Sequence, residues 1–201
     1  MRLVSIAPVA LDNGRDAILD AALALGEQRG WDAVHLHEVA RLAGLSLTEV
    51  RRHFEHKDAV AEAWFDRADA AMLAIAQTPG WAEASPRERL RAAIVAWLDA
   101  LAPHRRLAVP MLRYKFHPEH LHLQVRGIMR ISRTVQWLRD VALLPETGWR
   151  REVGEAALTS IYLATFARWL VDESPQSRDT FELLDRLLAV AEKAAIRVAP
   201  A

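Results

Sequence analysis

The chain has 201 residues, of which 52% are hydrophobic and 26% charged, and its 26 basic residues balance its 26 acidic ones. This is ordinary globular composition, and the length is sufficient to bury a core. The absence of cysteine excludes disulfides, thiol nucleophiles and cysteine metal sites, and it fits a reducing cytoplasm. The apolar start is broken by Pro8 and is too short for a signal peptide or a membrane span, so we expect a soluble, cytoplasmic protein with a loose N-terminal arm.

Helical periodicity recurs along the chain without sustained alternation, which predicts an all-α fold of about nine helices. The first helix is expected over about 13–29, ending at Gly30, which can adopt the left-handed conformation of a helix stop. A second is expected over about 36–42, closing at Gly44, and a third begins after Ser46. Two short helices joined by a tight turn around a glycine are typical of a helix-turn-helix unit.

The third helix has a clear start signal and an apolar side. Ser46 and Glu49 form the S-x-x-E pattern of a capping box, in which each side chain accepts from a free backbone N–H group. Val50 and Phe54 are expected to anchor this helix in a small core. The remaining side chains of the helix would face outward.

Six longer helices are expected in the rest of the chain. We therefore predict a helix-turn-helix domain with its N-terminal arm over 1–57 and a helical ligand-binding and dimerisation domain over 58–201. Ser85 and Pro86 give one of these helices a strong start. The expected helices cover about 58–77, 86–102, 104–114, 118–143, 156–171 and 181–196. The stretch 156–171 is apolar on nearly every side, so it must be buried all round, in a core or against a partner.

The segment 18–60 reads ILDAALALGEQRGWDAVHLHEVARLAGLSLTEVRRHFEHKDAV and resembles the tetracycline-repressor (TetR) family of bacterial regulators. The matching features are the ILDAA start, Gly30-Trp31, Val39-Ala40, the run Ala43-Gly44-Leu45-Ser46, His53-Phe54 and Lys57. The resemblance implies an all-helical homodimer whose two helix-turn-helix heads sit one DNA turn apart. It also implies a C-terminal domain that binds a ligand and forms the dimer.

A second resemblance covers parts of the larger domain. Segments 101–109, 161–174 and 179–188 look like the ubiquinone-biosynthesis accessory proteins that share the TetR fold. That resemblance implies a hydrophobic, lipid-sized cavity and, in some members, a head that no longer binds DNA.

The head departs from the family pattern in ways that bear on DNA binding. Arg51 stands where the family usually has an aromatic residue, and His35 stands where a threonine or serine usually caps the second helix. Residues 1–67 hold eight basic and eleven acidic side chains, a net charge of −3. An acidic head counts against tight non-specific DNA affinity.

Six residues at the third helix and just after it are predicted to contact DNA. Arg51 and Arg52 suit phosphates and guanine edges, although they also fit a solvated face paired with Glu49 or Glu55. The helix-turn-helix setting favours the DNA contact. The full set is Leu47, Thr48, Arg51, Arg52, His53 and Lys57. Of these, Leu47 fits a thymine methyl or a packing contact equally well, and Lys57 suits a phosphate.

Aromatic and methionine side chains of the larger domain are candidates for an apolar pocket between helices. Each fits core packing when taken singly, but together they could enclose a ligand. The candidate ligand-binding residues are Trp97, Met111, Met129, Trp137, Phe166 and Trp169. No buried charge is evident that would bind a polar ligand head, so we expect a large and mostly apolar ligand.

Nothing in the sequence indicates catalysis, a cofactor or a metal. The histidines at 117, 120 and 122 lack the spacing and the acidic or cysteine partners of a zinc site. His37-Glu38 begins an H-E-x-x-H pattern, but Arg41 stands at its fifth position. The nucleophile elbow, the P-loop and the dinucleotide glycine pattern are absent from the sequence.

We therefore expect a transcriptional regulator, a repressor, that binds a double-stranded DNA operator and is released by an apolar effector. The homodimer would form through the helices at about 150–171 and 179–196. The alternative is a lipid- or isoprenoid-binding accessory protein of the same fold whose head no longer binds DNA.

Overall fold

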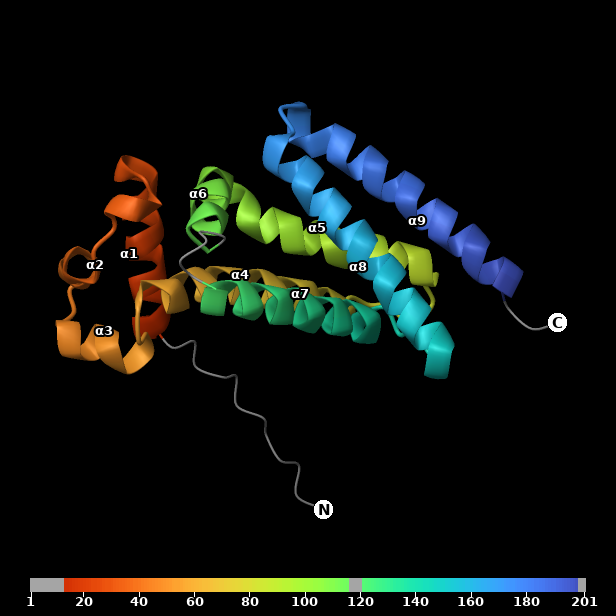
Figure 1. Cartoon of the computed structure of the whole chain (residues 1–201), viewed down its shortest axis with the longest axis horizontal. Helices are drawn as coiled ribbons and strands as arrows, with labels where there is room; N and C mark the ends of the chain where they lie inside the picture. The colour runs from red at the N-terminus through yellow and green to blue at the C-terminus, as the bar shows by residue number, and fades with distance from the viewer. Residues whose placement is uncertain (1–12, 116–120, 199–201) are drawn as a thin grey trace, which may run out of the picture. The chain divides into compact units, whose positions relative to one another are not determined.

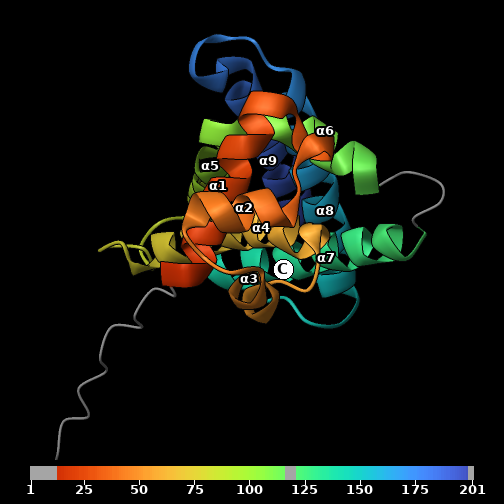
Figure 2. The same cartoon turned by 90° about the vertical axis from the view of Figure 1, so that its left-hand side faces the viewer.

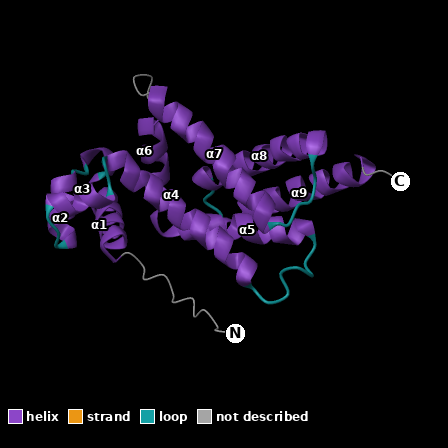
Figure 3. Ribbon diagram, turned by 90° about the horizontal axis from the view of Figure 1, so that it is seen from below, coloured by secondary structure: helices purple, strands orange, loops and turns teal. Residues whose placement is uncertain are grey.

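A computed structural model describes residues 13–115 and 121–198, which form helices joined by short loops and contain no strand (Figures 1 and 3). The α-helices are α1 (Asn13–Arg29), α2 (Leu36–Ala43), α3 (Leu47–His53), α4 (Lys57–Ala74), α5 (Pro86–Leu101), α6 (Arg105–Lys115), α7 (Leu121–Val141), α8 (Gly148–Val171) and α9 (Arg178–Val198). Short 3-10 segments are η1 (Trp31–Ala33), η2 (Ile75–Gln77), η3 (Ala102–His104) and η4 (Pro175–Ser177). The all-α prediction is confirmed, while the expected N-terminal arm lies outside the described residues.

The contacts divide the chain into two compact units, residues 1–64 and 65–201. The division falls within α4, whereas the predicted domain boundary at residue 57 falls at the first residue of that helix. None of the described helices combines the length and the apolar character needed to cross a membrane.

In the first unit, α1, α2 and α3 pack against one another around a small core (Figure 2). Gly30 and Gly44 take positive φ angles of 84° and 69°, so each ends its helix with a backbone conformation that side chains disfavour. The core side chains include Ile18, Leu23, Trp31, Val39, Val50, Phe54 and Val60. Val50 and Phe54 are thus buried, as predicted.

In the second unit, α5 packs against α7 and α9, and α8 packs against α7 and α9. The chain reverses at η4, so α8 and α9 run in opposite directions (Figure 1). The core includes Ile94, Trp97, Leu98, Leu101, Met111, Leu138, Trp169 and Leu184.

Helix α8 is not buried all round within the chain. It begins at Gly148, ahead of the apolar stretch that predicted it. Its buried face carries Leu158, Ile161 and Trp169, while Leu163 and Val171 are exposed. A single copy of the chain therefore leaves part of this apolar helix uncovered.

Candidate functional site

The turn between α2 and α3 is fixed by backbone geometry and by one capping box. Gly44 is left-handed, and its N–H group donates to the carbonyls of Ala40 and Arg41. The Ser46 N–H group donates to Glu49 Oε2 at 2.8 Å, and the Glu49 N–H group donates to Ser46 Oγ at 3.2 Å. The Ser46 hydroxyl also donates to Glu49 Oε2, at 2.7 Å, and the two bonds that Ser46 donates hold the pKa of the Glu49 carboxyl below its ordinary value. The predicted capping box is confirmed, and the Glu49 carboxylate caps the helix.

The outward face of α3 carries four of the six predicted DNA-contacting residues. Leu47, Thr48, Arg51 and Arg52 are exposed, whereas Val50 of the same helix is buried. Leu47 is 54% exposed, so this apolar side chain is available for contact. This face thus combines apolar, hydroxyl and cationic groups, the types that contact thymine methyls, phosphates and guanine edges.

Arg51 is held only loosely by the protein itself. Its guanidinium lies 3.7 Å from the carboxylate of Glu55, one turn further along the chain, and both side chains are mostly exposed. An exposed pair of this kind contributes little to stability, so little free energy is lost when Arg51 turns to another anion.

The other two predicted residues are engaged within the first unit. The Lys57 ammonium donates to the backbone carbonyls of Trp31 and Asp32, both at 3.2 Å, and lies over the Trp31 ring. His53 faces the start of α1, where a Cβ atom at Gly14 would lie 2.9 Å from His53 Nε2. Both residues connect elements of the head, and their contact with DNA stays a prediction.

One connection in the head is not signalled by local sequence spacing. Arg29 at the end of α1 makes a two-pronged ion pair with Glu38 in α2, with distances of 2.9 and 3.1 Å. The hydrogen bonds from Arg29 lower the pKa of Glu38. Glu38 and Glu49 are thus bonded within the head and stay ionised, so these contacts leave its net charge of −3 unchanged.

The six candidate ligand-binding residues do not form one cluster. Trp97, Phe166 and Trp169 are buried together, with the Phe166 ring centroid 5.4 Å from that of Trp97 and 5.9 Å from that of Trp169. Met111 is also buried. Met129 and Trp137, however, are 67% and 44% exposed on α7. The structure thus unites the aromatic residues of α5 and α8 and leaves the two α7 residues at the surface.

A buried charge adjoins this aromatic cluster, contrary to the expectation from sequence. Asp69 accepts from the indole N–H group of Trp97 at 2.8 Å, from Thr134 Oγ1 at 3.1 Å and from Arg130 Nη2 at 3.0 Å. Burial raises the pKa of Asp69, and the positive charge of Arg130 opposes that shift. Periodicity alone did not show that α4 and α7 bring these groups together inside the domain.

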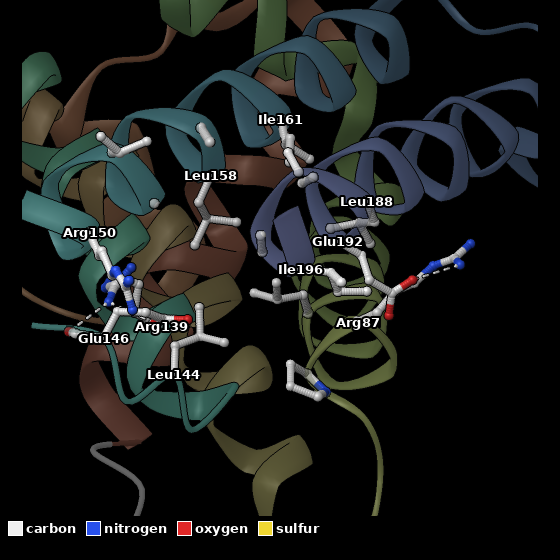
Figure 4. A pocket seen from close by; sticks show the side chains of 18 of the residues that line it. Arg87, Arg139, Leu144, Glu146, Arg150, Leu158, Ile161, Leu188, Glu192 and Ile196 are labelled. Carbon is white, nitrogen blue, oxygen red and sulfur yellow. Dashed lines mark hydrogen bonds and ion pairs between the residues drawn. The ribbon is translucent and has the colours of Figure 1, made fainter. Parts of the chain in front are cut away.

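A pocket of about 610 Å³ lies elsewhere, and the six candidate residues do not line it. Its walls come from the start of α5, the end of α7, the first half of α8 and the last half of α9 (Figure 4). Its lining is mostly apolar, with Leu144, Val153, Leu158, Ile161 and Leu188 among the contributors. The pocket was not predicted because four separate helices create it.

Among the described residues no group of three or more histidine, cysteine or acidic side chains is placed to hold a metal ion. His117 and His120 lie outside the described residues, as does the side chain of His122.

Comparison with known proteins assigns the fold. Residues 18–64 match the family described as bacterial regulatory proteins, tetR family. A TetR transcriptional regulator from Nitrosomonas europaea is 42% identical with a TM-score of 0.80, and the match covers 90% of this chain and 99% of that one. The chain belongs to the TetR family. The helix-turn-helix unit is therefore the head of a TetR-family transcriptional regulator, as the resemblance in the sequence implied.

More distant TetR-family structures share the fold alone. A regulator from Rhodococcus sp. RHA1 is 18% identical with a TM-score of 0.66, covering 89% of this chain and 94% of its own. A regulator from Streptomyces coelicolor is 18% identical with a TM-score of 0.60, covering 93% and 85%. No curated protein matches the chain.

Proposed function

We propose that this TetR-family chain is a repressor that binds operator DNA through the outward face of α3 and is released by an apolar small molecule. The observation that carries the proposal is the exposure of Leu47, Thr48, Arg51 and Arg52 on one face of a capped helix. A recognition helix enters the major groove with such side chains directed at base edges and phosphates.

The repressor would act as a dimer joined through α8 and α9. Support comes from large apolar side chains outside the pocket that a single chain leaves exposed on these two helices: Leu163, Val171 and Val190. Heads spaced about 34–36 Å apart fit successive major grooves. A ligand that binds better to another spacing shifts the population away from the DNA-bound form.

The test is binding of the purified protein to the DNA that precedes its own gene, followed by fluorescence anisotropy across a salt series. Arg51→Ala combined with Arg52→Ala should weaken binding about 10- to 100-fold and reduce the slope of log affinity against log salt by about two. The matched control is Arg106→Ala with Arg113→Ala, which removes the same charge from exposed positions of α6. Affinity too weak to measure at low salt, or equal losses in both double variants, contradicts the proposal.

The alternative function is a lipid- or isoprenoid-binding accessory protein with a head that no longer binds DNA. The apolar pocket of about 610 Å³ supports it, since that volume lies within the range of about 300–1,000 Å³ usual for ligand sites. Native mass spectrometry distinguishes the two. A co-purified quinone or lipid together with no DNA affinity favours the alternative, and an empty protein that binds DNA favours the repressor.

A further inference from the structure

One cationic side chain in the pocket of about 610 Å³ has an unused hydrogen-bond donor. The side chain of Arg139, near the end of α7, is 5% exposed and lines that pocket. Its Nη2 group makes long contacts with Glu146, at 3.4 Å to Oε2 and 3.5 Å to the carbonyl. Its Nη1 group is buried and has no hydrogen-bond acceptor among the described residues.

Arg89, another buried arginine at this end of the domain, has backbone carbonyls as acceptors for its donor groups. The Arg89 Nε group donates to the carbonyl of Ala142 at 2.8 Å, and its Nη1 group donates to the carbonyls of Ala82 and Ala84. Arg89 therefore has a structural role that joins the start of α5 to the end of α7. Arg139 lacks such a set of carbonyls, although a buried cation normally gains acceptors for its donors.

The backbone of α8 passes close to the unused donor. A Cβ atom at Gly154 would lie 3.2 Å from Arg139 Nη1, which is a tight contact. Because position 154 has no side chain, the α8 backbone can lie this close to the Nη1 group without a clash.

The rest of the pocket is mostly apolar, apart from Glu146, Arg150 and the pair of Arg87 with Glu192. Figure 4 shows Arg139 with Glu146 on one side and Arg87 with Glu192 on the other. Arg87 is already bonded, to Glu192 Oε2 at 3.4 Å and to the carbonyl of Asp185 at 3.3 Å. The unused donor thus belongs to Arg139, and the apolar surface begins directly beside it.

We propose that this pocket binds an amphipathic monoacid, a single-chain carboxylate. One carboxylate oxygen would accept from Arg139 Nη1, and the chain would lie against Leu144, Leu158 and Leu188. A charge-assisted hydrogen bond in a buried site is among the stronger ones, and the apolar lining favours the chain. A single unused donor matches one carboxylate oxygen, whereas the additional charged oxygens of a phosphate would need donors beyond Arg139 Nη1. The site requires no DNA binding by the head.

The experiment is isothermal titration calorimetry of the full chain with dodecanoate, dodecan-1-ol and dodecyl phosphate, each below its micelle concentration or its solubility limit. Dodecanoate should bind one molecule per chain and at least about tenfold more tightly than the other two probes. Arg139→Gln should abolish the preference for the acid over the alcohol. The control Arg87→Gln should retain it, since that guanidinium is already occupied.

A second variant, Gly154→Ala, tests the same site in case Arg139→Gln does not fold. Gly154→Ala lies in regular helix, where the higher helix propensity of alanine offsets part of the strain from the tight contact, so the variant should stay folded. Its added methyl group crowds Nη1, so dodecanoate affinity should fall by about fivefold or more while alcohol affinity changes less.

Equal affinity for acid and alcohol, or undiminished acid binding in both variants, overturns the proposal. Absence of binding by all three probes overturns it as well. If sedimentation then shows that Arg139→Gln weakens the dimer, the pocket belongs to the interface with a second copy. These titrations contain no DNA, so their failure leaves operator binding by α3 untouched.

Discussion

The two units of the chain are fixed by hydrogen bonds of different range. In the head, the capping box of Ser46 and Glu49 spans three residues, and the pair of Arg29 with Glu38 spans nine. In the larger unit, Asp69 is bonded by groups 28, 61 and 65 residues away along the chain. The turn between α2 and α3 is therefore specified by short patterns, whereas the Asp69 cluster of the larger unit depends on distant segments that meet around a buried carboxylate.

The difference explains why the head has a sequence signature that the larger unit lacks. A helix cap or a left-handed glycine requires particular residue types at particular spacings. A buried carboxylate surrounded by donors can be assembled from any helices that place them correctly. Variants that remove either a long-range buried hydrogen-bond acceptor or a short-range helix cap can test this difference between the two units.

The largest loss is expected from Asp69→Ala. This change leaves the Arg130 guanidinium, the Trp97 indole N–H group and the Thr134 hydroxyl without their shared acceptor. Breaking a buried pair on one side costs about 3–5 kcal/mol, because a desolvated charge stays behind. Urea unfolding monitored by tryptophan fluorescence measures the loss.

Asp66→Ala is the matched control for that experiment. Asp66 also pairs with Arg130, at 2.8 Å, but its side chain is 40% exposed. We expect a loss of about 1 kcal/mol or less, since exposed pairs contribute little. If both variants lost the same stability, burial around Asp69 would not be the source of the effect.

The outcome of the sequence predictions follows the same division. The helix-turn-helix unit, its capping box and the anchors Val50 and Phe54 were readable because each depends on residues a few positions apart. Met129 and Trp137 were grouped with the ligand-binding residues by type and not by face. They lie off the apolar stripe of α7, whose members Val135, Leu138 and Ala142 are buried, so the periodicity already indicated their exposure.

Other features could not be derived from periodicity at all. The Asp69 cluster and the pocket beside Arg139 need the packing of helices that are far apart in sequence. Hydrophobic spacing reports which face of a helix is buried, but not which neighbour covers it. It therefore could not show that only some of the six candidate ligand-binding residues lie together, and it missed the buried charges.

The turn between α8 and α9 belongs to the larger unit but is fixed by hydrogen bonds between residues close in sequence. Breaking these bonds should cause the next largest loss of stability. Asp172 is buried, and it accepts from the N–H and Oγ groups of Ser174 at 2.8 and 2.6 Å and from the Thr180 N–H group at 2.7 Å. Burial alone would raise its pKa, but these hydrogen bonds outweigh burial and hold the pKa well below the ordinary value. Asp172→Ala should cost about 2–3 kcal/mol near neutral pH.

The pH dependence of this loss has a definite sign. A carboxyl whose pKa is lower in the folded chain stabilises the fold above its unfolded pKa, about 3.9, and the contribution fades as the pH falls below it. Urea midpoints of wild type and Asp172→Ala should therefore differ most near pH 7 and approach each other from about pH 4 downward. A difference that stayed constant with pH would show that packing, and not the charge of Asp172, stabilises the turn.

The smallest change in stability is expected from the capping box, a motif that occurs in both units. The two boxes allow the same substitution to be compared in each unit. Ser46→Ala in α3 and Ser85→Ala in α5 each remove a hydroxyl that accepts from a backbone N–H group, a loss of about 1 kcal/mol for the helix end. Helix α3 spans only Leu47–His53, and it buries Val50 as its main anchor. Helix α5 buries six residues along its length, including Trp97.

Local opening should therefore respond unequally to the two serine changes. In Ser46→Ala, amide hydrogen exchange in α3 should accelerate about fivefold, since opening there depends directly on the cap. In Ser85→Ala, the amides beyond the first turn of α5 should keep their protection, because tertiary packing holds that helix. DNA affinity should fall in the first variant alone, as the α3 backbone positions Arg51 and Arg52. Equal acceleration along both helices would mean that α5 is held by its own local signals as much as α3 is, and the contrast between the two units would fail.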